Sequence, residues 1–268
     1  MDALSHWKER RPREAVLELQ KEIRADPGNA RQRVFLFQLL AVLGEWDRAL
    51  TQLAVLGDLD AGMLAMVHTY REAIRCELLR GGVFAGRRAP LIFGEPTRWL
   101  ALLVEAVRLS AAGHHAEAGA LRAQALAEAP ASPGRIDGHG FEWIADADSR
   151  LGPVLEAVVH GRYYWIPFSR VARIDLEAPA DLRDLVWMPA RLTWLNGGVA
   201  VGLIPSRYPG SEACPDVAVQ TARKTQWLEP APGTYWGLGQ RLWVTDGGEY
   251  ALFDVREILL HGEAAAHG

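Results

Sequence analysis

Three acidic residues lie close together in the segment Phe-Glu-Trp-Ile-Ala-Asp-Ala-Asp-Ser-Arg. Glu142, Asp146 and Asp148 are near enough to share one site, and alternating carboxylates can ligate a hard cation. The segment lacks the glycine and the closing acid of a calcium loop, and Asp148 is a good helix N-cap residue. We therefore favour helix capping and pairing with arginine. The alternative is a hydrolase that uses these acids with Arg183 or Arg207.

Other residue types that carry chemistry form weaker patterns. His114 and His115 are adjacent, so on a helix their side chains diverge by about 100° and cannot form an i, i+4 metal pair. Cys76 and Cys214 are too few and too far apart for a disulfide framework. The sequence contains no Gly-x-Ser-x-Gly motif, and no Gly-Lys-Ser/Thr follows its glycine-rich loop. We expect no catalytic residue, no metal site and no cofactor.

Large aromatic side chains beside prolines form the densest pattern. They occur in residues 163–168, 186–190 and 207–212, and seven of the ten tryptophans lie from Trp143 onward. Aromatic rings and prolines on strand edges can form a groove for a peptide, whereas the alternative is a β-rich domain that buries the rings. We expect Arg183 and Arg207 to orient a partner. The expected aromatic contacts are Trp143, Tyr163, Tyr164, Trp165, Trp187 and Tyr208.

The residues before position 130 have the periodicity of helices, because apolar side chains recur at intervals of three and four. Ala15 and Ala49 are 34 residues apart, which is the tetratricopeptide period. A later copy aligns Ala118 with Ala15 at three periods plus one residue. We therefore expect tetratricopeptide-like helical repeats over residues 1–130, with a break in the period near residue 80.

The sequence changes character after the helical half. Residues 131–140 are rich in Pro, Ser and Gly and are expected to form a linker or surface loop. Beyond them, short β-type runs alternate with turns such as residues 196–198. We expect residues 141–268 to form a Trp-rich domain, with one helix within residues 148–159 and a closing helix over residues 255–260. The predicted fold class is α+β and multidomain, with all-α repeats before a β-rich α+β domain.

Composition excludes several classes of protein. The chain has 268 residues and a net charge of −4, which disfavours binding to nucleic acid or to an anionic membrane through bulk charge. Hydrophobic residues make up 49% of the chain, a globular composition. The first twelve residues are polar and charged, unlike a secretory leader. No apolar run approaches the ~20 residues that cross a bilayer, so we expect a cytoplasmic protein.

Seven long segments of the chain match one family. They are residues 33–40, 69–77, 93–99, 141–153, 161–167, 181–187 and 204–212. With these segments the sequence resembles the ImpE/SciE family, also called TagJ, of accessory proteins of bacterial type VI secretion systems. The segments run along almost the whole chain, which is more specific than a single short motif.

The resemblance implies a non-enzymatic cytoplasmic protein with a tetratricopeptide-like N-terminal part and an α+β C-terminal part. It also implies a partner, the small subunit of the contractile sheath, bound through that subunit's N-terminal helical segment. An indirect link to the AAA+ ATPase that disassembles and recycles the sheath is implied too. The family supplies no catalytic residues to carry over.

Our leading hypothesis is therefore an adaptor. We expect the helical array and the Trp-rich domain to form the two walls of a groove for an amphipathic helix. Two alternatives remain open, the hydrolase described above and a sensor that binds a small ligand between the two halves.

Overall fold

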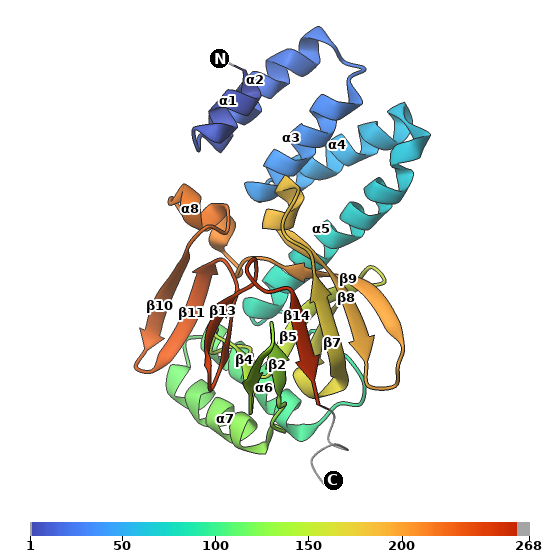
Figure 1. Cartoon of the computed structure of the whole chain (residues 1–268). Helices are drawn as coiled ribbons and strands as arrows, with labels where there is room; N and C mark the ends of the chain where they lie inside the picture. Colours follow the sequence, from blue (N-terminus) through green and yellow to red (C-terminus); the bar gives the residue numbers. More distant parts are fainter. Residues whose placement is uncertain (1, 262–268) are drawn as a thin grey trace.

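Helices fill the first half of the chain in the computed structural model, which describes residues 2–261 (Figure 1). Five of them follow one another and two form a later pair, with the two-residue strand β1 (Leu91–Ile92) between the groups. Their bounds are α1 (Ala3–Lys8), α2 (Pro12–Ala25), α3 (Ala30–Val42), α4 (Trp46–Leu59), α5 (Leu64–Phe84), α6 (Arg98–Ala111) and α7 (His115–Glu128). No helix within residues 2–261 is long and apolar enough to span a bilayer.

Three helical hairpins, α1–α2, α3–α4 and α6–α7, share one turn geometry. Two residues before the second helix, Arg10, Gly44 and Gly113 have φ angles of 60°, 70° and 84°. In each turn the following amide donates to the carbonyl five residues earlier at 2.9 Å, the hydrogen bond of a Schellman motif. The fourth residue of each second helix is a fully buried alanine: Ala15, Ala49 and Ala118. A side chain this small lets the paired helices approach closely.

A nine-stranded sheet forms the body of the second half, in the order β1-β6-β5-β9-β8-β7-β14-β2-β3. Its strands pair antiparallel, except that β1 runs parallel to β6. The bounds are β2 (Gly134–Ile136), β3 (His139–Phe141), β5 (Val154–Val159), β6 (Arg162–Pro167), β7 (Val171–Leu176), β8 (Trp187–Trp194), β9 (Val199–Pro205) and β14 (Glu257–Leu260). Because β1 comes from the first half of the chain, both halves contribute to this sheet.

Smaller elements complete the second half. A hairpin of β10 (Thr225–Ala231) and β11 (Thr234–Gly239) lies beside a three-stranded sheet in the order β13-β12-β4. That sheet comprises β4 (Ile144–Asp146), β12 (Leu242–Thr245) and β13 (Gly248–Ala251). The short helices are η1 (Ala61–Met63), η2 (Phe168–Arg170), η3 (Leu182–Leu185), η4 (Ser211–Ala213) and α8 (Val217–Gln220).

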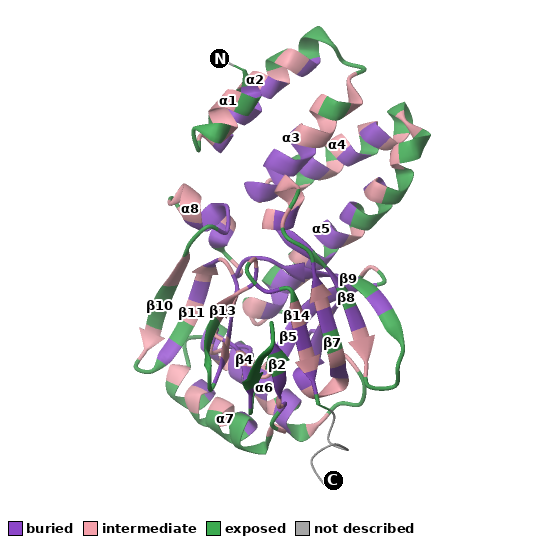
Figure 2. Ribbon diagram, in the orientation of Figure 1, coloured by how far each residue is buried: buried purple, intermediate pink, exposed green. Residues whose placement is uncertain are grey.

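One hydrophobic core joins the helices to the sheet. It contains Leu36 and Tyr70 from the helical half together with Trp165 and Trp187 from the sheet. A second core lies within the β-rich half, around residues such as Ile174. In Figure 2 the buried residues continue from α3 and α5 into the strands that these helices meet. The helical half therefore stabilises the sheet directly through apolar burial.

The expected α+β class, with helices first and a β-rich part second, is confirmed. The division into units 1–130 and 141–268 stays a prediction. Residues 131–140 do not form a free loop, because β2 and the start of β3 lie there. A Cβ atom at Gly134 would lie 2.1 Å from the carbonyl oxygen of Leu259, so this glycine permits close strand approach rather than marking a turn.

Two expected helices are strands. Residues 148–159 contain β5, and all six of its residues are buried, so the run is apolar except for Glu156 and shows no strand alternation. Residues 255–260 contain β14, which lies between β7 and β2. Only four residues of it pair, too few for their periodicity to distinguish a strand from a helix. Residues 262–268 of the expected Trp-rich domain lie outside the described part of the chain.

Candidate functional site

A chain of buried charges crosses the centre of the molecule, where α5 meets β5. The carboxylate of Glu156 accepts from Arg80 Nε at 2.8 Å and from Arg80 Nη2 at 3.0 Å. The same carboxylate pairs with Arg241, which also pairs with Asp146. At most 3% of any of these four residues is exposed. Charges this deep are tolerated only when each has a partner, so the network fixes α5 against the sheet.

Burial and pairing act in opposite directions on the two carboxyls. Burial favours the neutral form of Glu156, but the guanidiniums of Arg80 and Arg241 outweigh it and hold its pKa at about 2. For Asp146, burial prevails over the Arg241 charge and raises the pKa to about 6. Environment alone therefore separates the proton affinities of two carboxyls that share one guanidinium.

The predicted acidic cluster is divided between core and surface. Glu142 is exposed, whereas Asp146 and Asp148 are buried. Asp146 accepts from the Tyr208 hydroxyl at 3.0 Å and from the Asp148 amide at 2.9 Å. Asp148 accepts from Arg150 Nε at 2.9 Å and from Arg150 Nη2 at 2.6 Å. The expected pairing with arginine is present, although it lies in the core rather than at the surface.

These hydrogen bonds leave no free carboxylate oxygen in the buried part of the cluster. The second oxygen of Asp146 pairs with Arg241, and the second oxygen of Asp148 also accepts from the Gly237 amide at 2.8 Å. Because every oxygen of these two carboxylates already accepts from a protein donor, few lone pairs are left for a substrate or a metal ion. No group of three or more His, Cys, Asp or Glu side chains suited to a metal ion occurs among residues 2–261.

Four of the six predicted contact aromatics lie in the core, since Tyr163, Trp165, Trp187 and Tyr208 are each 0% exposed. Trp165 Nε1 donates to the Tyr163 hydroxyl at 2.7 Å, and Trp187 Nε1 donates to Glu77 at 3.2 Å. The expectation that these rings contact a partner does not fit their burial. Residue type and spacing predicted an aromatic cluster correctly but did not reveal which rings face solvent.

Trp187 is the centre of an aromatic contact between the two halves. Its ring centroid lies 5.7 Å from that of Tyr70 in α5 and 5.9 Å from that of Trp46 in α4. The guanidinium of Arg183, a predicted orienting residue, lies 5.0 Å from the Tyr70 centroid and pairs with Asp181 at 3.0 Å. Burial raises the pKa of Tyr70 to about 12, so its hydroxyl stays protonated in this contact.

Arg207, the second predicted orienting residue, is buried at the end of α3. Its guanidinium donates to the carbonyl of Val42 at 2.6 Å and to that of Ala41 at 3.0 Å. These are terminal carbonyls of the helix, where a cation interacts favourably with the helix dipole. Arg80 Nη2 in turn donates to the Arg207 carbonyl at 3.0 Å. Arg207 therefore orients a helix of its own chain.

The remaining predicted contacts are more exposed but lie on separate elements. Trp143, between β3 and β4, is 41% exposed and lines a pocket of about 570 Å³ beside α7. Tyr164 lies on β6 and packs edge-on against Phe93. Arg183 lies on η3 and is half-buried. The structure does not gather these three residues into one site.

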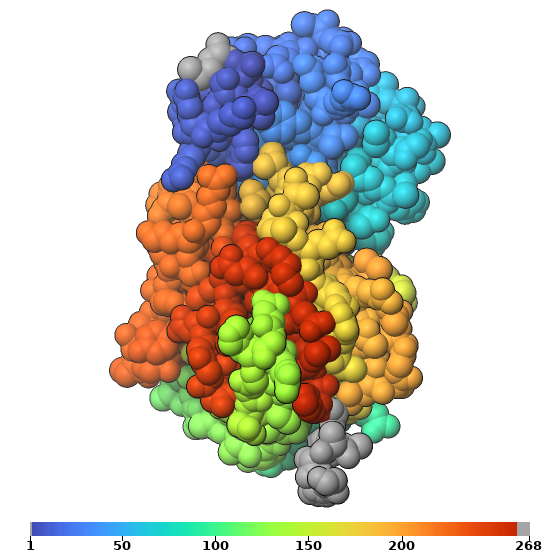
Figure 3. Space-filling model, in the orientation of Figure 1, coloured from blue at the N-terminus to red at the C-terminus, as the bar shows by residue number. Residues whose placement is uncertain are grey.

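An open groove between the two halves contains residues that sequence reasoning missed. We call it the α1–η3 groove, and its volume is about 440 Å³. In Figure 3 the surfaces of α1 (dark blue), the segment before η3 (yellow) and the α8 region (orange) meet on this face. Its lining residues are Leu4, Trp7, Phe35, Gln38, Pro179, Ala180, Asp181, Leu182, Leu185 and Arg223.

The walls of the α1–η3 groove are apolar and half-exposed. Leu4 is 50% exposed, and Trp7, Phe35 and Leu185 are intermediate. The guanidinium of Arg223 lies 5.9 Å from the Trp7 ring centroid and gives one wall a positive charge. These residues come from positions 4 to 223, so no local motif indicated them. Half-exposed apolar side chains that converge from several elements are typical of an interaction surface.

Comparison with known proteins assigns the family. The model of the ImpE protein family matches residues 138–259. The type VI secretion system accessory component TagJ of Pseudomonas aeruginosa is 54% identical over 245 residues, which cover 91% of this chain and 86% of that protein. The chain belongs to the ImpE family. A crystal structure of a Vibrio parahaemolyticus protein, 22% identical, matches the ImpE fold with a TM-score of 0.89 over 98% of both chains.

The ImpE family match covers one side of the buried charge network. Asp146, Glu156 and Arg241 lie within the matched residues 138–259, whereas Arg80 lies on α5 outside them. The relative that covers 91% of the chain includes most of the helical half as well. In this ImpE family member, the helices therefore supply Arg80, the cation that pairs with Glu156 of the matched β-rich half.

Proposed function

We propose that this ImpE family chain is a non-enzymatic adaptor of a type VI secretion system. The observation that carries the proposal is its 54% identity to a protein named as an accessory component of that system. The state of the acidic cluster supports it, since the oxygens of Asp146 and Asp148 are engaged by internal donors. The hydrolase alternative required carboxylates that converge on a pocket with free oxygens.

The helical half is the scaffold of the adaptor, and we propose that its hairpins are degenerate tetratricopeptide-like repeats. α2 begins at Pro12 and α4 at Trp46, which is 34 residues later. α3 begins at Ala30 and α5 at Leu64, again 34 residues later. The common turn and the buried alanine of the three hairpins support the same interpretation. Arrays of this kind present grooves to extended or helical peptides.

The proposed partner is the small subunit of the contractile sheath, and its N-terminal helical segment occupies the α1–η3 groove. An amphipathic helix offers apolar anchors at i, i+3 or i+4, and i+7, which suit Trp7, Phe35 and Leu182. Arg223 at the wall favours a carboxylate on the flank of that helix. Trp143, Tyr164 and Arg183 stay candidates for further contacts outside the groove.

This function places the protein in the cytoplasm. A partner in the sheath also gives it an indirect link to the AAA+ ATPase that disassembles and recycles the sheath. The adaptor contacts that ATPase only through the sheath subunit.

Calorimetric titration of the full chain with the N-terminal peptide of the sheath subunit tests the proposal. We expect binding by the unaltered chain and a loss of at least about tenfold in affinity for Phe35→Ala or Trp7→Ala, because a few aromatic anchors carry most of the energy of such interfaces. Val201→Ala is the matched control, since Val201 lies on β9 with 73% of its surface exposed and does not line the groove.

Two different negative results distinguish an incorrect partner from an incorrect binding surface. Absence of heat with the unaltered chain at high micromolar peptide contradicts the proposed partner. Binding that Phe35→Ala and Trp7→Ala leave unchanged supports the partner and rejects the α1–η3 groove as its surface.

A further inference from the structure

A cavity with a volume of about 360 Å³ lies where the end of α5 meets α6. Part of its wall is apolar, because Val83 of α5 and Val104 and Val107 of α6 line it. Val83 and Val107 are buried, whereas Val104 is half-exposed. Arginine side chains line the rest of the wall. We call it the α5–α6 cavity.

The turn that ends α5 brings two of these arginines to the cavity. Gly86 follows the helix with a φ angle of 68°, and the Arg87 amide donates to the Gly82 carbonyl at 2.9 Å, which closes a Schellman motif. A Cβ atom at Gly86 would lie 3.2 Å from the Arg108 carbonyl oxygen, so glycine lets the turn contact α6. The turn therefore fixes the backbone of Arg87 and Arg88 beside the cavity.

Three guanidiniums and one carboxylate line the α5–α6 cavity. Arg108 uses the carboxylate, because its Nε and Nη2 donate to Glu105 at 2.8 and 2.6 Å. Arg87 and Arg88 are exposed, and neither side chain forms an ion pair or a hydrogen bond with the rest of residues 2–261. Two positive charges at the cavity thus have no counter-charge from the described chain.

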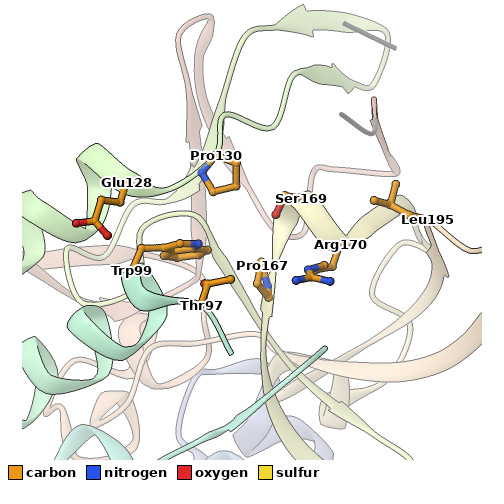
Figure 4. A pocket seen from close by; sticks show the side chains of 8 residues that line it. All are labelled: Thr97, Trp99, Glu128, Pro130, Pro167, Ser169, Arg170 and Leu195. Carbon is orange, nitrogen blue, oxygen red and sulfur yellow. The ribbon is translucent and has the colours of Figure 1, made fainter. Parts of the chain in front are cut away.

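A second cavity, at the start of α6, has a different balance of charge. Its volume is about 460 Å³, and Figure 4 shows Glu128 on one side of it and Arg170 on the other. Its lining contains one guanidinium and one carboxylate. A pair of uncompensated guanidiniums therefore distinguishes the α5–α6 cavity from its neighbour, and Arg170 supplies a matched control.

Adjacent guanidiniums without partners favour an acidic ligand. Hydrogen bonds between a guanidinium and a carboxylate are about twice as strong as neutral ones, and arginine clusters recur as binding sites for acidic peptide motifs. The net charge of −4 does not oppose this, because charges beyond about 8 Å are screened at physiological ionic strength. The valine wall favours a ligand that also has an apolar side chain, which a simple anion lacks.

We propose that the α5–α6 cavity binds an acidic segment of a partner protein. An apolar side chain of that segment packs against the valines, and the carboxylates beside it pair with Arg87 and Arg88. The cavity shares no lining residue with the α1–η3 groove. This second binding site therefore goes beyond the proposed adaptor function and does not depend on the sheath subunit as a partner.

Fluorescence anisotropy with the full chain tests the proposal. The probe is a dye-labelled Asp-Asp-Leu-Glu-Glu peptide with blocked termini. We expect saturable binding that weakens as salt is added, and a loss of at least about tenfold in affinity for the double variant Arg87→Gln, Arg88→Gln. Arg170→Gln is the matched control and should keep the affinity of the unaltered chain, because Arg170 lines the other cavity.

Two altered peptides distinguish the cavity from a general attraction between charges. Asn-Asn-Leu-Gln-Gln removes the carboxylates, and Asp-Asp-Ser-Glu-Glu removes the apolar side chain. We expect each to bind at least about tenfold more weakly than the probe, because the site uses both kinds of contact.

The proposal is overturned if the probe shows no binding at about 1 mM, or if the double variant binds it as the unaltered chain does. Equal affinity for the serine peptide also overturns it, because the cavity would then play no part. Tighter binding of a labelled oligothymidylate of equal charge would assign the arginines to nucleic acid instead. Phe35→Ala should bind the probe normally, so failure of this site is distinct from failure of the α1–η3 groove.

Discussion

Glu156 accepts hydrogen bonds from Arg80, Arg241 and the Tyr163 hydroxyl, and none of its side chain reaches solvent. At this scale the buried acids and arginines form the junction between the helices and the sheet. The sequence placed Asp146 correctly as a partner for arginine. It did not indicate Glu156, because a single acid within an apolar run carries no local signal of its distant partners.

Replacing Glu156 by glutamine leaves the Arg80 and Arg241 guanidiniums buried with too little negative charge. We expect Glu156→Gln to lower the free energy of unfolding by about 3–5 kcal/mol, measured by urea denaturation at pH 7. Glu105→Gln is the matched control, since Glu105 pairs with Arg108 at the surface and its loss has little effect. Similar stability losses for the two variants would contradict the role of the network.

The contribution of Glu156 also depends on pH. Its pKa falls from 4.5 to about 2 on folding, because Arg80 and Arg241 outweigh the effect of burial. A lowered pKa stabilises the fold above the unfolded value, and this stabilisation disappears as the pH falls through the folded value. The difference in stability between the unaltered chain and Glu156→Gln should shrink as the pH falls from 4.5 toward 2. A difference that grows below pH 4.5 would rule this out.

The two cysteines differ in reactivity. Burial raises the pKa of Cys76 to about 12, and its thiol lies 3.5 Å from the Gly161 carbonyl, so almost no thiolate forms at pH 8. Cys214 is partly exposed. We expect a disulfide reagent to titrate one thiol in the native protein and a second only after unfolding. Two rapidly reacting native thiols would show that the region around Cys76 is open.

At the scale of elements, the sequence predicted helices better than strands. The repeat period located α2 and α4, because their apolar residues line one face. The turn before α2 has Arg10 at the position where the other two hairpins have glycine, so that turn carried no glycine signal. β5 is buried on both faces, and its apolar run was compatible with a helix. Partners far along the chain, rather than local propensity, decided the structure there.

Arg207 connects the segment after β9 to α3, because its guanidinium donates to carbonyls at the end of that helix. Arg207→Met keeps most of the side-chain volume but removes the side-chain donor of the Val42 carbonyl and leaves the Ala41 carbonyl with only the Gly44 amide. We expect a loss of about 1–3 kcal/mol in stability and faster amide exchange in the last turn of α3. The control is Arg173→Met, which removes two exposed ion pairs, with Asp175 on β7 and with Glu257 on β14. Unchanged amide exchange in the last turn of α3 would show that Arg207 does not stabilise the end of that helix.

At the scale of the whole molecule, the two expected units share one hydrophobic core. Leu36, Tyr70, Trp165 and Trp187 belong to one cluster, so neither half buries its apolar surface alone. We expect a single unfolding transition, with tryptophan fluorescence and far-ultraviolet circular dichroism changing at the same urea concentration. Helical signal lost before the fluorescence change would show that the helices unfold separately.

The candidate binding surface was the least predictable feature. The α1–η3 groove combines Leu4 and Trp7 from the start of the chain with Leu182 and Arg223 from its second half. The sequence directed attention to the aromatic residues of the second half, whose rings the fold largely buries. Only the packing of α1 and α3 beside η3 brings the groove residues together.

The parallel pairing of β1 with β6 limits how members of this family can be recombined. A chimera that joins the helices of this chain to the β-rich half of another member keeps β1, Arg80 and Tyr70 but replaces β6, Glu156 and Trp187, which they contact here. A crossover at residues 131–140 does not fall between two independent units. The β1–β6 pairing, the Arg80–Glu156 ion pair and the Tyr70–Trp187 contact each join residues from its two sides. Both partners of each contact must therefore be inherited together. We expect a substitution in the helical half to be accompanied by a matching substitution in the β-rich half.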